Sequence, residues 1–281
     1  MTQGKTILIT GATSGIGLAT ARALAGQGAH LILAARSEAK LKEASQDITS
    51  TTGQKNISYY TADLSSQKSI RAMAEKVKAD HSSLDVLINN AGGVFPDFAL
   101  TDDGLEMTIA TNHFSQFLLT NLLLDLIKKS DYARIVNVSS DSHYNGKIDF
   151  ESFKKDKGYF IMKAYAQSKL ANVLFTQELA ARLAGTQVTA NSLHPGFVKT
   201  NIGNKDTTWY ASAVWSLITA IGAISVEKGA ATSVYLASSD DLRGMTGKYF
   251  NKCKEQKPGK QTFDKVLQKE LWRVSEELCP L

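Results

Sequence analysis

The chain has 281 residues, of which 43% are hydrophobic and 21% charged, and 32 Lys and Arg against 27 Asp and Glu give a formal net charge of +5. At roughly 100–200 residues per domain, this length fits one large α/β domain or two small ones. The composition excludes wholesale disorder, and 20 Gly with 4 Pro exclude a collagen-like or proline-rich chain. Two cysteines, Cys253 and Cys279, are too few for a disulfide framework or a zinc finger and suit a reducing compartment.

The N-terminal residues 1–5 lead directly into a short apolar run, without the apolar region and cleavage site of a secretory signal. We therefore expect a cytoplasmic protein. The main basic cluster is a set of five lysines near Pro258: Lys248, Lys252, Lys254, Lys257 and Lys260. Since neither interleaved aromatics nor a groove-reading helix accompanies them, the cluster indicates a solvated loop, and we expect no nucleic-acid partner.

Apolar runs alternate with segments of helical periodicity along most of the chain. The runs predict buried strands at residues 6–10, 31–35, 57–61, 86–89, 135–139, 188–193 and about 248–250. The periodic segments predict helices at residues 15–27, 38–49, 67–79, 105–128, 164–183, 227–237 and about 261–278. This alternation predicts an α/β Rossmann fold, a doubly wound parallel sheet of about seven strands with helices on both faces. No repeat or linker divides the chain, so we expect one domain over residues 1–281.

Residues 207–226 carry no charged side chain. The stretch is the length of a membrane span, but Thr, Ser and Gly occur throughout it and it lies inside the fold pattern. It predicts a buried or lid helix over an apolar pocket, so we expect a substrate lid at about 200–226; a helix that dips into a membrane surface stays open. Its large apolar residues indicate a hydrophobic substrate or plain core packing: Trp209, Tyr210, Trp215, Leu217 and Ile218.

A glycine-rich loop joins the first strand to the first helix. Its sequence is Thr-Gly-Ala-Thr-Ser-Gly-Ile-Gly over residues 10–17. Such glycines allow a tight turn, close approach of backbone N–H groups to a pyrophosphate, and close packing of helix on strand. A purely structural turn is disfavoured because the loop follows a strand and opens a βαβ unit. The predicted cofactor-binding residues of the loop are Gly11, Thr13, Ser14, Gly15, Ile16 and Gly17.

The second predicted strand ends in Ala34-Ala35-Arg36. An acidic residue at this place would bind the ribose 2′-hydroxyl of NAD(H), whereas the planar cation of Arg36 suits a 2′-phosphate. The residue therefore predicts NADP(H) rather than NAD(H), with a plain surface arginine as the alternative.

Tyr165 and Lys169 lie four residues apart on a predicted helix, which puts phenol and ammonium on one face. A free phenol has a pKa near 10, and a neighbouring Lys⁺ and an oxidised nicotinamide would lower it enough for acid–base work. Ser139 and Ser140 end a strand at the carboxyl edge of the sheet, where a hydroxyl could meet a substrate carbonyl. Asn112, inside a predicted helix, indicates either a polar role or a satisfied core amide.

Taken together, these motifs resemble the short-chain dehydrogenase/reductase superfamily from Lys5 to about Asn251, in its single-domain NADP(H)-using branch and most closely its retinol dehydrogenase-like group. The resemblance implies four catalytic residues: Asn112, Ser140, Tyr165 and Lys169. It also implies the remaining cofactor contacts. These are Asp63 and Leu64 at the adenine, Asn90, Ala91 and Gly92 at the adenosine ribose, Tyr165 and Lys169 at the nicotinamide ribose, and Pro195, Gly196, Val198 and Thr200 at the nicotinamide.

The chain departs from that pattern between Ser140 and Tyr165, where residues 146–157 lengthen the span. This insertion could cover part of the substrate mouth or interfere with the usual dimer helices, so whether the chain forms a homodimer stays open. The five histidines have no metal-ligand spacing, and we expect no metal.

The sequence thus predicts an NADP(H)-dependent oxidoreductase that interconverts an alcohol and a carbonyl on a hydrophobic substrate, with Tyr165 as general acid and base. Two rivals are a nucleotide-sugar epimerase or dehydratase, disfavoured by the glycine spacing and by the lack of a larger C-terminal domain, and a non-catalytic NADP(H)-binding scaffold. The presence of both Tyr165 and Lys169 argues against the scaffold.

Overall fold

The computed structural model describes residues 2–197 and 224–281. Their eight strands form one sheet in the order β3-β2-β1-β4-β5-β6-β7-β8, with the first seven parallel and β8 antiparallel to β7. The strands are β1 (Thr6–Thr10), β2 (His30–Ala35), β3 (Ile57–Thr61), β4 (Val86–Asn89), β5 (Ala133–Val138), β6 (Val188–His194), β7 (Tyr249–Asn251) and β8 (Lys254–Gln256). The predicted doubly wound α/β sheet is confirmed, and β8 is an addition that the sequence did not suggest.

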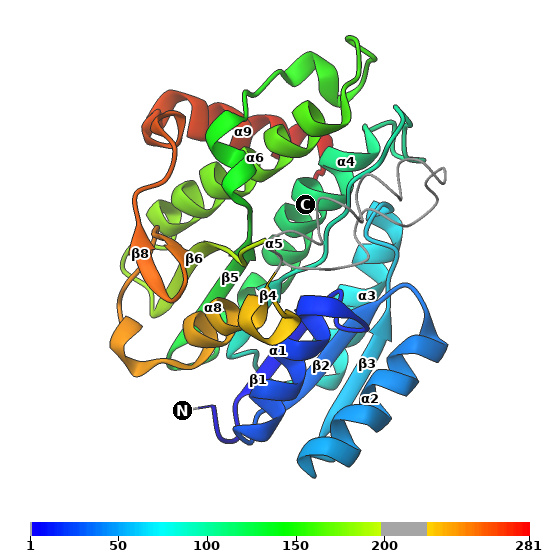
Figure 1. The fold of residues 1–281 in the computed structure, drawn as a ribbon, viewed down its shortest axis with the longest axis vertical. Coiled ribbons are helices and arrows are strands. Elements are labelled where there is room, and N and C mark those ends of the chain that lie inside the picture. Colours follow the sequence, from blue (N-terminus) through cyan, green and yellow to red (C-terminus); the bar gives the residue numbers. More distant parts are fainter. Residues whose placement is uncertain (1, 198–223) are drawn as a thin grey trace.

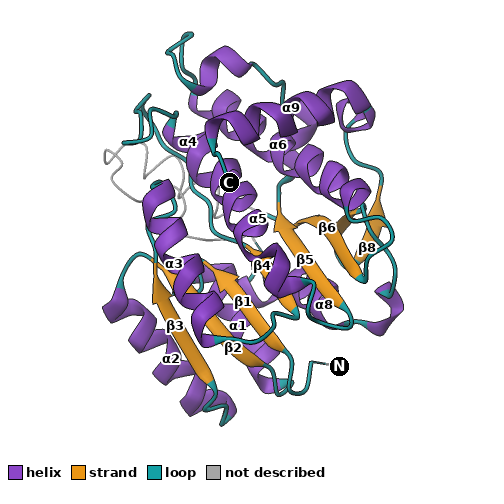
Figure 2. Ribbon diagram, turned by 180° about the vertical axis from the view of Figure 1, so that it is seen from behind, coloured by secondary structure: helices purple, strands orange, loops and turns teal. Residues whose placement is uncertain are grey.

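Helices cover both faces of this sheet (Figures 1 and 2). They are α1 (Gly15–Gly26), α2 (Glu38–Thr52), α3 (Gln67–Asp80), α4 (Met107–Ile109), α5 (Ser115–Ile127), α6 (Ile161–Arg182), α8 (Val226–Ser238) and α9 (Lys265–Leu278). Helices α1, α2 and α8 pack on one face, while α3, α5 and α6 pack on the other. Alternate residues of each strand serve the two cores, as in β1, where Ile7 and Ile9 face α1 and Leu8 faces the opposite layer.

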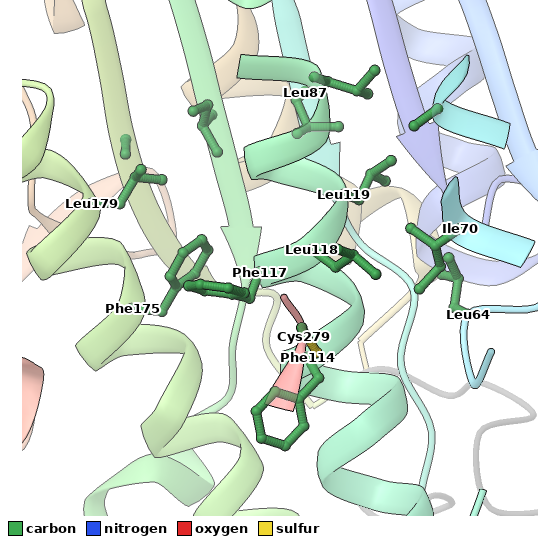
Figure 3. Close-up of a cluster of buried hydrophobic side chains, with 14 of the residues drawn as sticks. Leu64, Ile70, Leu87, Phe114, Phe117, Leu118, Leu119, Phe175, Leu179 and Cys279 are labelled. Atoms are coloured by element: carbon green, nitrogen blue, oxygen red, sulfur yellow. The ribbon is translucent and has the colours of Figure 1, made fainter. Parts of the chain in front are cut away.

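The C-terminal helix α9 packs on α6. Its Trp272 lies against Phe117 of α5 and Phe175 of α6, with ring centroids 5.1 Å and 5.8 Å apart. Figure 3 shows Phe117 and Phe175 facing each other between their helices, with ring centroids 5.7 Å apart. The last helix thus closes the core beside α5 and α6; it begins at Lys265, after a 3-10 turn at Lys260–Phe263, rather than at residue 261.

The prediction of one long helix over residues 105–128 was wrong. The structure has the short α4, then a π-helical turn at Ala110–Phe114, then α5. A π turn adds a residue to the helical ring and frequently marks a functional site. Here Glu106 starts the helix, since its carboxylate accepts hydrogen bonds from the N–H groups of Thr108 and Ile109, and the π turn contains Asn112.

The insertion after Ser140 is anchored to the body of the protein. It contains a 3-10 turn at Phe150–Phe153, in which Phe153 is fully buried and packs edge-on against Phe114. Gln167 of α6 accepts a hydrogen bond from the N–H of Asp149 and donates one to Ser152. The insertion therefore lies against α6 rather than projecting into solvent.

The predicted lid at about 200–226 and the uncharged stretch 207–226 lie largely outside the described residues. No helix within residues 2–197 and 224–281 has both the length and the apolar character that crossing a membrane requires. The lysines near Pro258 lie on or beside the β7–β8 hairpin, where Lys248 pairs with Glu255 at 3.0 Å.

Candidate active site

The predicted site residues gather at the carboxyl ends of the parallel strands. The strand order reverses between β1 and β4, since β2 and β3 lie on one side of β1 while β4 and β5 follow on the other. In open α/β sheets, ligands bind in the crevice at such a reversal. The loops after β1, β4, β5 and β6 all reach this edge, so chemistry from four separate stretches of sequence converges there.

The loop after β1 has the backbone shape of a phosphate cradle. Gly11 has φ +68°, in the left-handed region that favours glycine. At Gly17, a Cβ would lie 2.2 Å from the carbonyl oxygen of Gly11, so only glycine permits this closeness of helix and loop. Ser14 precedes α1 without capping it through its side chain, which leaves the first-turn N–H groups available to an anion.

Two more predicted contacts follow the adjacent strands. Arg36 comes directly after β2, is exposed, and precedes Ser37, which caps α2. No carboxylate ends β2, where an NAD(H)-binding acid would stand. After β3, Leu64 is buried, while the carboxylate of Asp63 accepts hydrogen bonds from the backbone and hydroxyl of Ser65.

The loop after β4 is fastened to β1. The hydroxyl of Thr10 accepts hydrogen bonds from the N–H groups of Asn90 and Ala91, both at 3.0 Å, and the Asn90 amide donates to the Thr10 carbonyl at 2.8 Å. Sequence reasoning assigned no role to Thr10, although a threonine before the first glycine of the loop was the available signal. These hydrogen bonds set the position of Gly92, the next residue in the loop.

Gly92 lies tightly against the predicted catalytic residues. A Cβ on Gly92 would stand 2.9 Å from Oδ1 of Asn112 and 3.3 Å from Nζ of Lys169. The loop after β4, the π turn and α6 therefore meet at this glycine.

Asn112 is fully buried and holds these elements together. Its Oδ1 accepts from the N–H of Gly93 at 2.7 Å, and its Nδ2 donates to the Gly93 carbonyl and to the hydroxyl of Ser168, both at 2.9 Å. All three bonds are made with residues outside the π turn, and they hold the Asn112 side chain in place. The sequence assigned no role to Ser168, whose place beside Lys169 in the Tyr165–Lys169 motif was the available signal.

Tyr165 and Lys169 share one face of α6, with the Lys169 Nζ 5.5 Å from the centre of the Tyr165 ring. Lys169 is buried, its Nζ donates to the Val138 carbonyl at 3.2 Å, and desolvation lowers its pKa to about 8. Burial raises the pKa of Tyr165, although a hydrogen bond with Ser140 partly opposes this. The expected lowering of the phenol pKa is thus not what the protein's own residues produce.

The two serines after β5 have different surroundings. The Ser139 hydroxyl is buried and donates to the Lys169 carbonyl at 2.7 Å, which ties β5 to α6. Ser140 is hydrogen-bonded to Tyr165 and caps the 3-10 turn Asp141–Asn145, accepting from the N–H of Ser142. Its hydroxyl therefore stands beside the phenol, whereas that of Ser139 serves the fold.

The last predicted contacts follow β6. Pro195 and Gly196 lie at the same edge of the sheet, and Gly196 has φ +89°. Val198 and Thr200 lie outside the described residues. In the part of the chain that the structure describes, no group of three or more His, Cys, Asp or Glu could hold a metal ion.

Comparison with known proteins agrees with this geometry. The family model for short chain dehydrogenases matches residues 5–211. The chain belongs to the short-chain dehydrogenase family. It is 42% identical to mouse retinol dehydrogenase 14 over 98% of this chain and 85% of that protein, and 42% identical to human retinol dehydrogenase 13 over 99% and 85%.

Comparison with solved structures supports the same family. An uncharacterised protein from Mycobacterium paratuberculosis matches with a TM-score of 0.80 and 34% identity over 99% of this chain and 94% of that one. A variant of actinorhodin polyketide ketoreductase, determined with NADPH, matches with a TM-score of 0.68 and 26% identity over 88% and 95%. The chain is therefore an oxidoreductase of this family, in its retinol dehydrogenase-like group, and nicotinamide cofactors are the family's redox partners.

Proposed function

We propose that this short-chain dehydrogenase uses NADP(H) to interconvert an alcohol and a carbonyl on a hydrophobic substrate. The observation that carries the proposal is the contact between Ser140 and Tyr165 above a buried Lys169, at the sheet edge that also holds the glycine cradle. Retention of all three groups in one cluster favours an enzyme over a scaffold of the same fold.

The residues present fit a dinucleotide along this edge. The loop Gly11–Gly17, with Thr13, Ser14, Gly15 and Ile16, would hold the pyrophosphate, because its backbone donors are open and its close packing excludes side chains at Gly17. The exposed guanidinium of Arg36 would bind a 2′-phosphate, and it forms no ion pair with any described residue.

The other predicted cofactor contacts take places along the same path. They are Asp63 and Leu64 for the adenine, Asn90, Ala91 and Gly92 for its ribose, Lys169 for the nicotinamide ribose, and Pro195, Gly196, Val198 and Thr200 for the nicotinamide. When bound, the reduced nicotinamide supplies a hydride, which is a proton with two electrons.

The protein's own residues supply the proton and manage the charge. During reduction, the Tyr165 hydroxyl gives its proton to the carbonyl oxygen, while the Ser140 hydroxyl donates a hydrogen bond to that oxygen as negative charge develops. The Lys169 ammonium stabilises the phenolate left behind. Asn112 holds the loop after β4 and α6 together, and the second lone pair of its Oδ1 is where a relay water would bind.

Exposed apolar side chains before Tyr165 on the chain and after β6 support a hydrophobic substrate. Met162, one helical turn before Tyr165, is 43% exposed, and Phe160 at the start of α6 is 61% exposed. Phe197, after Gly196, is 43% exposed. The relatives named as retinol dehydrogenases favour the same class of substrate.

A panel of hydrophobic aldehydes and ketones, followed by NADPH oxidation at 340 nm, tests the proposal directly. We expect wild-type turnover on at least one of them, a higher kcat/KM with NADPH than with NADH, and a loss of about 10²–10⁴-fold in kcat for Tyr165→Phe. Full turnover by Tyr165→Phe would refute the mechanism, and NADPH binding without turnover of any carbonyl or alcohol would favour the scaffold.

Two further predictions belong to this proposal, and one question stays open. Residues 1–281 form one domain with a substrate lid at about 200–226 and the C-terminal helix as its last element. We expect the protein in the cytoplasm. A measurement of its molecular mass in solution would show whether it forms a homodimer.

A further inference from the structure

The turn that follows Ser140 is held by a distant part of the chain. This turn, Asp141–Asn145, is hydrogen-bonded to the loop at residues 257–261, which joins β8 to α9 (Figure 1). The Tyr144 hydroxyl donates to the Lys257 carbonyl at 2.7 Å, and the Gln261 amide donates to the Gly146 carbonyl at 2.7 Å. Between these two contacts, the N–H of Gly259 donates to Nε2 of His143 at 3.0 Å.

The loop 257–261 is itself well fixed. Gly259 is buried, and its carbonyl accepts hydrogen bonds from the N–H and the hydroxyl of Thr262. Gln268 of α9 donates to Thr262 and to Gln177 of α6. The Gly259 N–H therefore points at His143 from a rigid support.

The contact with Gly259 determines how His143 meets Ser140. A neutral imidazole has one donor and one acceptor nitrogen. Since Nε2 accepts from Gly259, the hydrogen is on Nδ1, which lies 2.7 Å from the Ser140 carbonyl and donates to it. A chain of two hydrogen bonds thus runs from the C-terminal loop to the backbone of the serine that faces Tyr165.

The surroundings of His143 keep the ring neutral and in place. The side chain is 1% exposed, and its ring lies against those of Tyr144 and Tyr249, with centroids 4.1 Å and 4.6 Å away. Burial lowers the pKa of His143, against the opposing effects of the Ser140 carbonyl and Asp141.

Several titratable groups face this ring from the neighbouring elements. Asp141 of the turn accepts a hydrogen bond from Tyr249 of β7 and lies 3.4 Å from His194 of β6. Burial lowers the pKa of His194, Asp141 opposes this effect, and His143 and the Lys252 cation lower the pKa further. A charged His143 would carry a hydrogen on Nε2, so it could no longer accept the hydrogen bond from the Gly259 N–H.

We propose that His143 is a positioning residue for Ser140, and that the Gly259 N–H holds its ring in the neutral form that donates to the Ser140 carbonyl. The inference rests on the proposed function, because Ser140 matters to turnover only if the site reduces a carbonyl. It makes the loop 257–261 part of the active-site support, although that loop lies more than a hundred residues from Ser140 in sequence.

The test compares Gly259→Pro with Gly259→Ala. Gly259 has φ −56°, which proline adopts without strain, and proline removes the N–H and fills its place with ring carbon. Alanine keeps the N–H, and its Cβ would make ordinary contacts at 3.5 Å with His143 and Tyr144. The readouts are kcat and KM with a reducible carbonyl, the Kd for NADPH, and the titration of the His143 imidazole by NMR.

We expect Gly259→Pro to lower kcat about 10-fold, to leave the Kd for NADPH within 2-fold, and to raise the pKa of His143, while Gly259→Ala behaves as wild type. A second pair of variants, at His143, tests the proposal even if Gly259→Pro does not fold. His143→Asn keeps an amide donor for the Ser140 carbonyl and should retain more kcat than His143→Leu, which has none.

The outcomes separate the two proposals. If the wild-type protein reduces carbonyls and neither Gly259→Pro nor His143→Leu slows it, the positioning role of His143 is wrong while the proposed function stands. If the wild-type protein turns over no carbonyl or alcohol, the proposed function fails, and the catalytic role of His143 fails with it. An unchanged His143 titration in Gly259→Pro would overturn the claim that Gly259 holds the ring neutral.

Discussion

A single methyl group at Gly92 should disable the site while leaving the fold largely intact. The Cβ of Gly92→Ala would lie 2.9 Å from Oδ1 of Asn112, about 0.5 Å inside the 3.4 Å at which ordinary contacts begin. The Asn112 amide would have to move by that amount, because the other contact, with Lys169 Nζ at 3.3 Å, is also tight. Such a shift stretches the 2.7 Å and 2.9 Å hydrogen bonds to Gly93 toward the limit of useful geometry.

The expected cost follows from these distances. Overpacking of this kind costs about 1–3 kcal/mol, and misplacing reacting groups by about 1 Å can cost about 10²-fold in rate. A displacement of about half that size predicts a fall of about 10-fold in kcat/KM, with a Tm lower by a few degrees.

The neighbouring glycine provides the matched control. A Cβ on Gly93 would meet the ring edge of Phe95 at 3.2 Å, which is the far end of a side chain and not the catalytic cluster. Both variants are measured for NADPH oxidation with one competent carbonyl and for thermal unfolding. Equal activity of Gly92→Ala and Gly93→Ala would refute the reasoning that the loop after β4 positions Asn112 and Lys169.

Two further predictions concern the cofactor and the fold. Arg36→Asp should reverse the preference for NADPH over NADH, measured as the ratio of kcat/KM values, because a carboxylate repels a 2′-phosphate and accepts from a ribose hydroxyl; an unchanged ratio would leave Arg36 a plain surface residue. Burial opposes ionisation of Asp85, but hydrogen bonds from Ser130, the Thr6 N–H and Lys5 outweigh it and lower its pKa. The stabilisation is present above the unfolded pKa of about 3.9 and is lost as pH falls through the folded value, so Asp85→Asn should cost about 1–3 kcal/mol of unfolding free energy at pH 7 and progressively less as the pH falls below the unfolded pKa, by urea denaturation. An equal cost above and below the unfolded pKa would show that the charge of Asp85 does not contribute.

The strands and the glycine loop could be predicted because their signals are local. Apolar runs such as residues 6–10 and 57–61 have the length of parallel strands, and both strands have these bounds in the structure, although the predicted burial holds for β1 and not for the edge strand β3, whose residues are half-buried or exposed. The long helix from residue 105 could not be resolved in this way. Its π turn depends on partners of Asn112 that lie at Gly93 and Ser168, far away in sequence.

The support of the site could not be predicted for a related reason. The loop 257–261 reads as a solvated lysine-rich turn, and its lysine side chains are indeed exposed at Lys257 and Lys260. Its function in the fold comes from backbone groups, the Gly259 N–H and the Lys257 carbonyl, which carry no sequence signature. Side-chain chemistry can be inferred from a motif, whereas a backbone donor becomes visible only when the fold brings it to its acceptor.

The pKa of Tyr165 expected from the sequence differs from its pKa in the folded protein. Spacing alone predicts a phenol acidified by Lys169, but in the folded protein desolvation is the larger effect on both groups: it raises the pKa of Tyr165 and lowers that of Lys169 to about 8. At neutral pH the phenol therefore keeps its proton, which is the form needed to protonate a carbonyl oxygen, and Lys169 is still mostly charged. In the proposed mechanism, oxidation of an alcohol needs the phenolate instead, and the positive charge of an oxidised nicotinamide would favour it. We therefore expect activity in the oxidative direction to require a higher pH than activity in the reductive one.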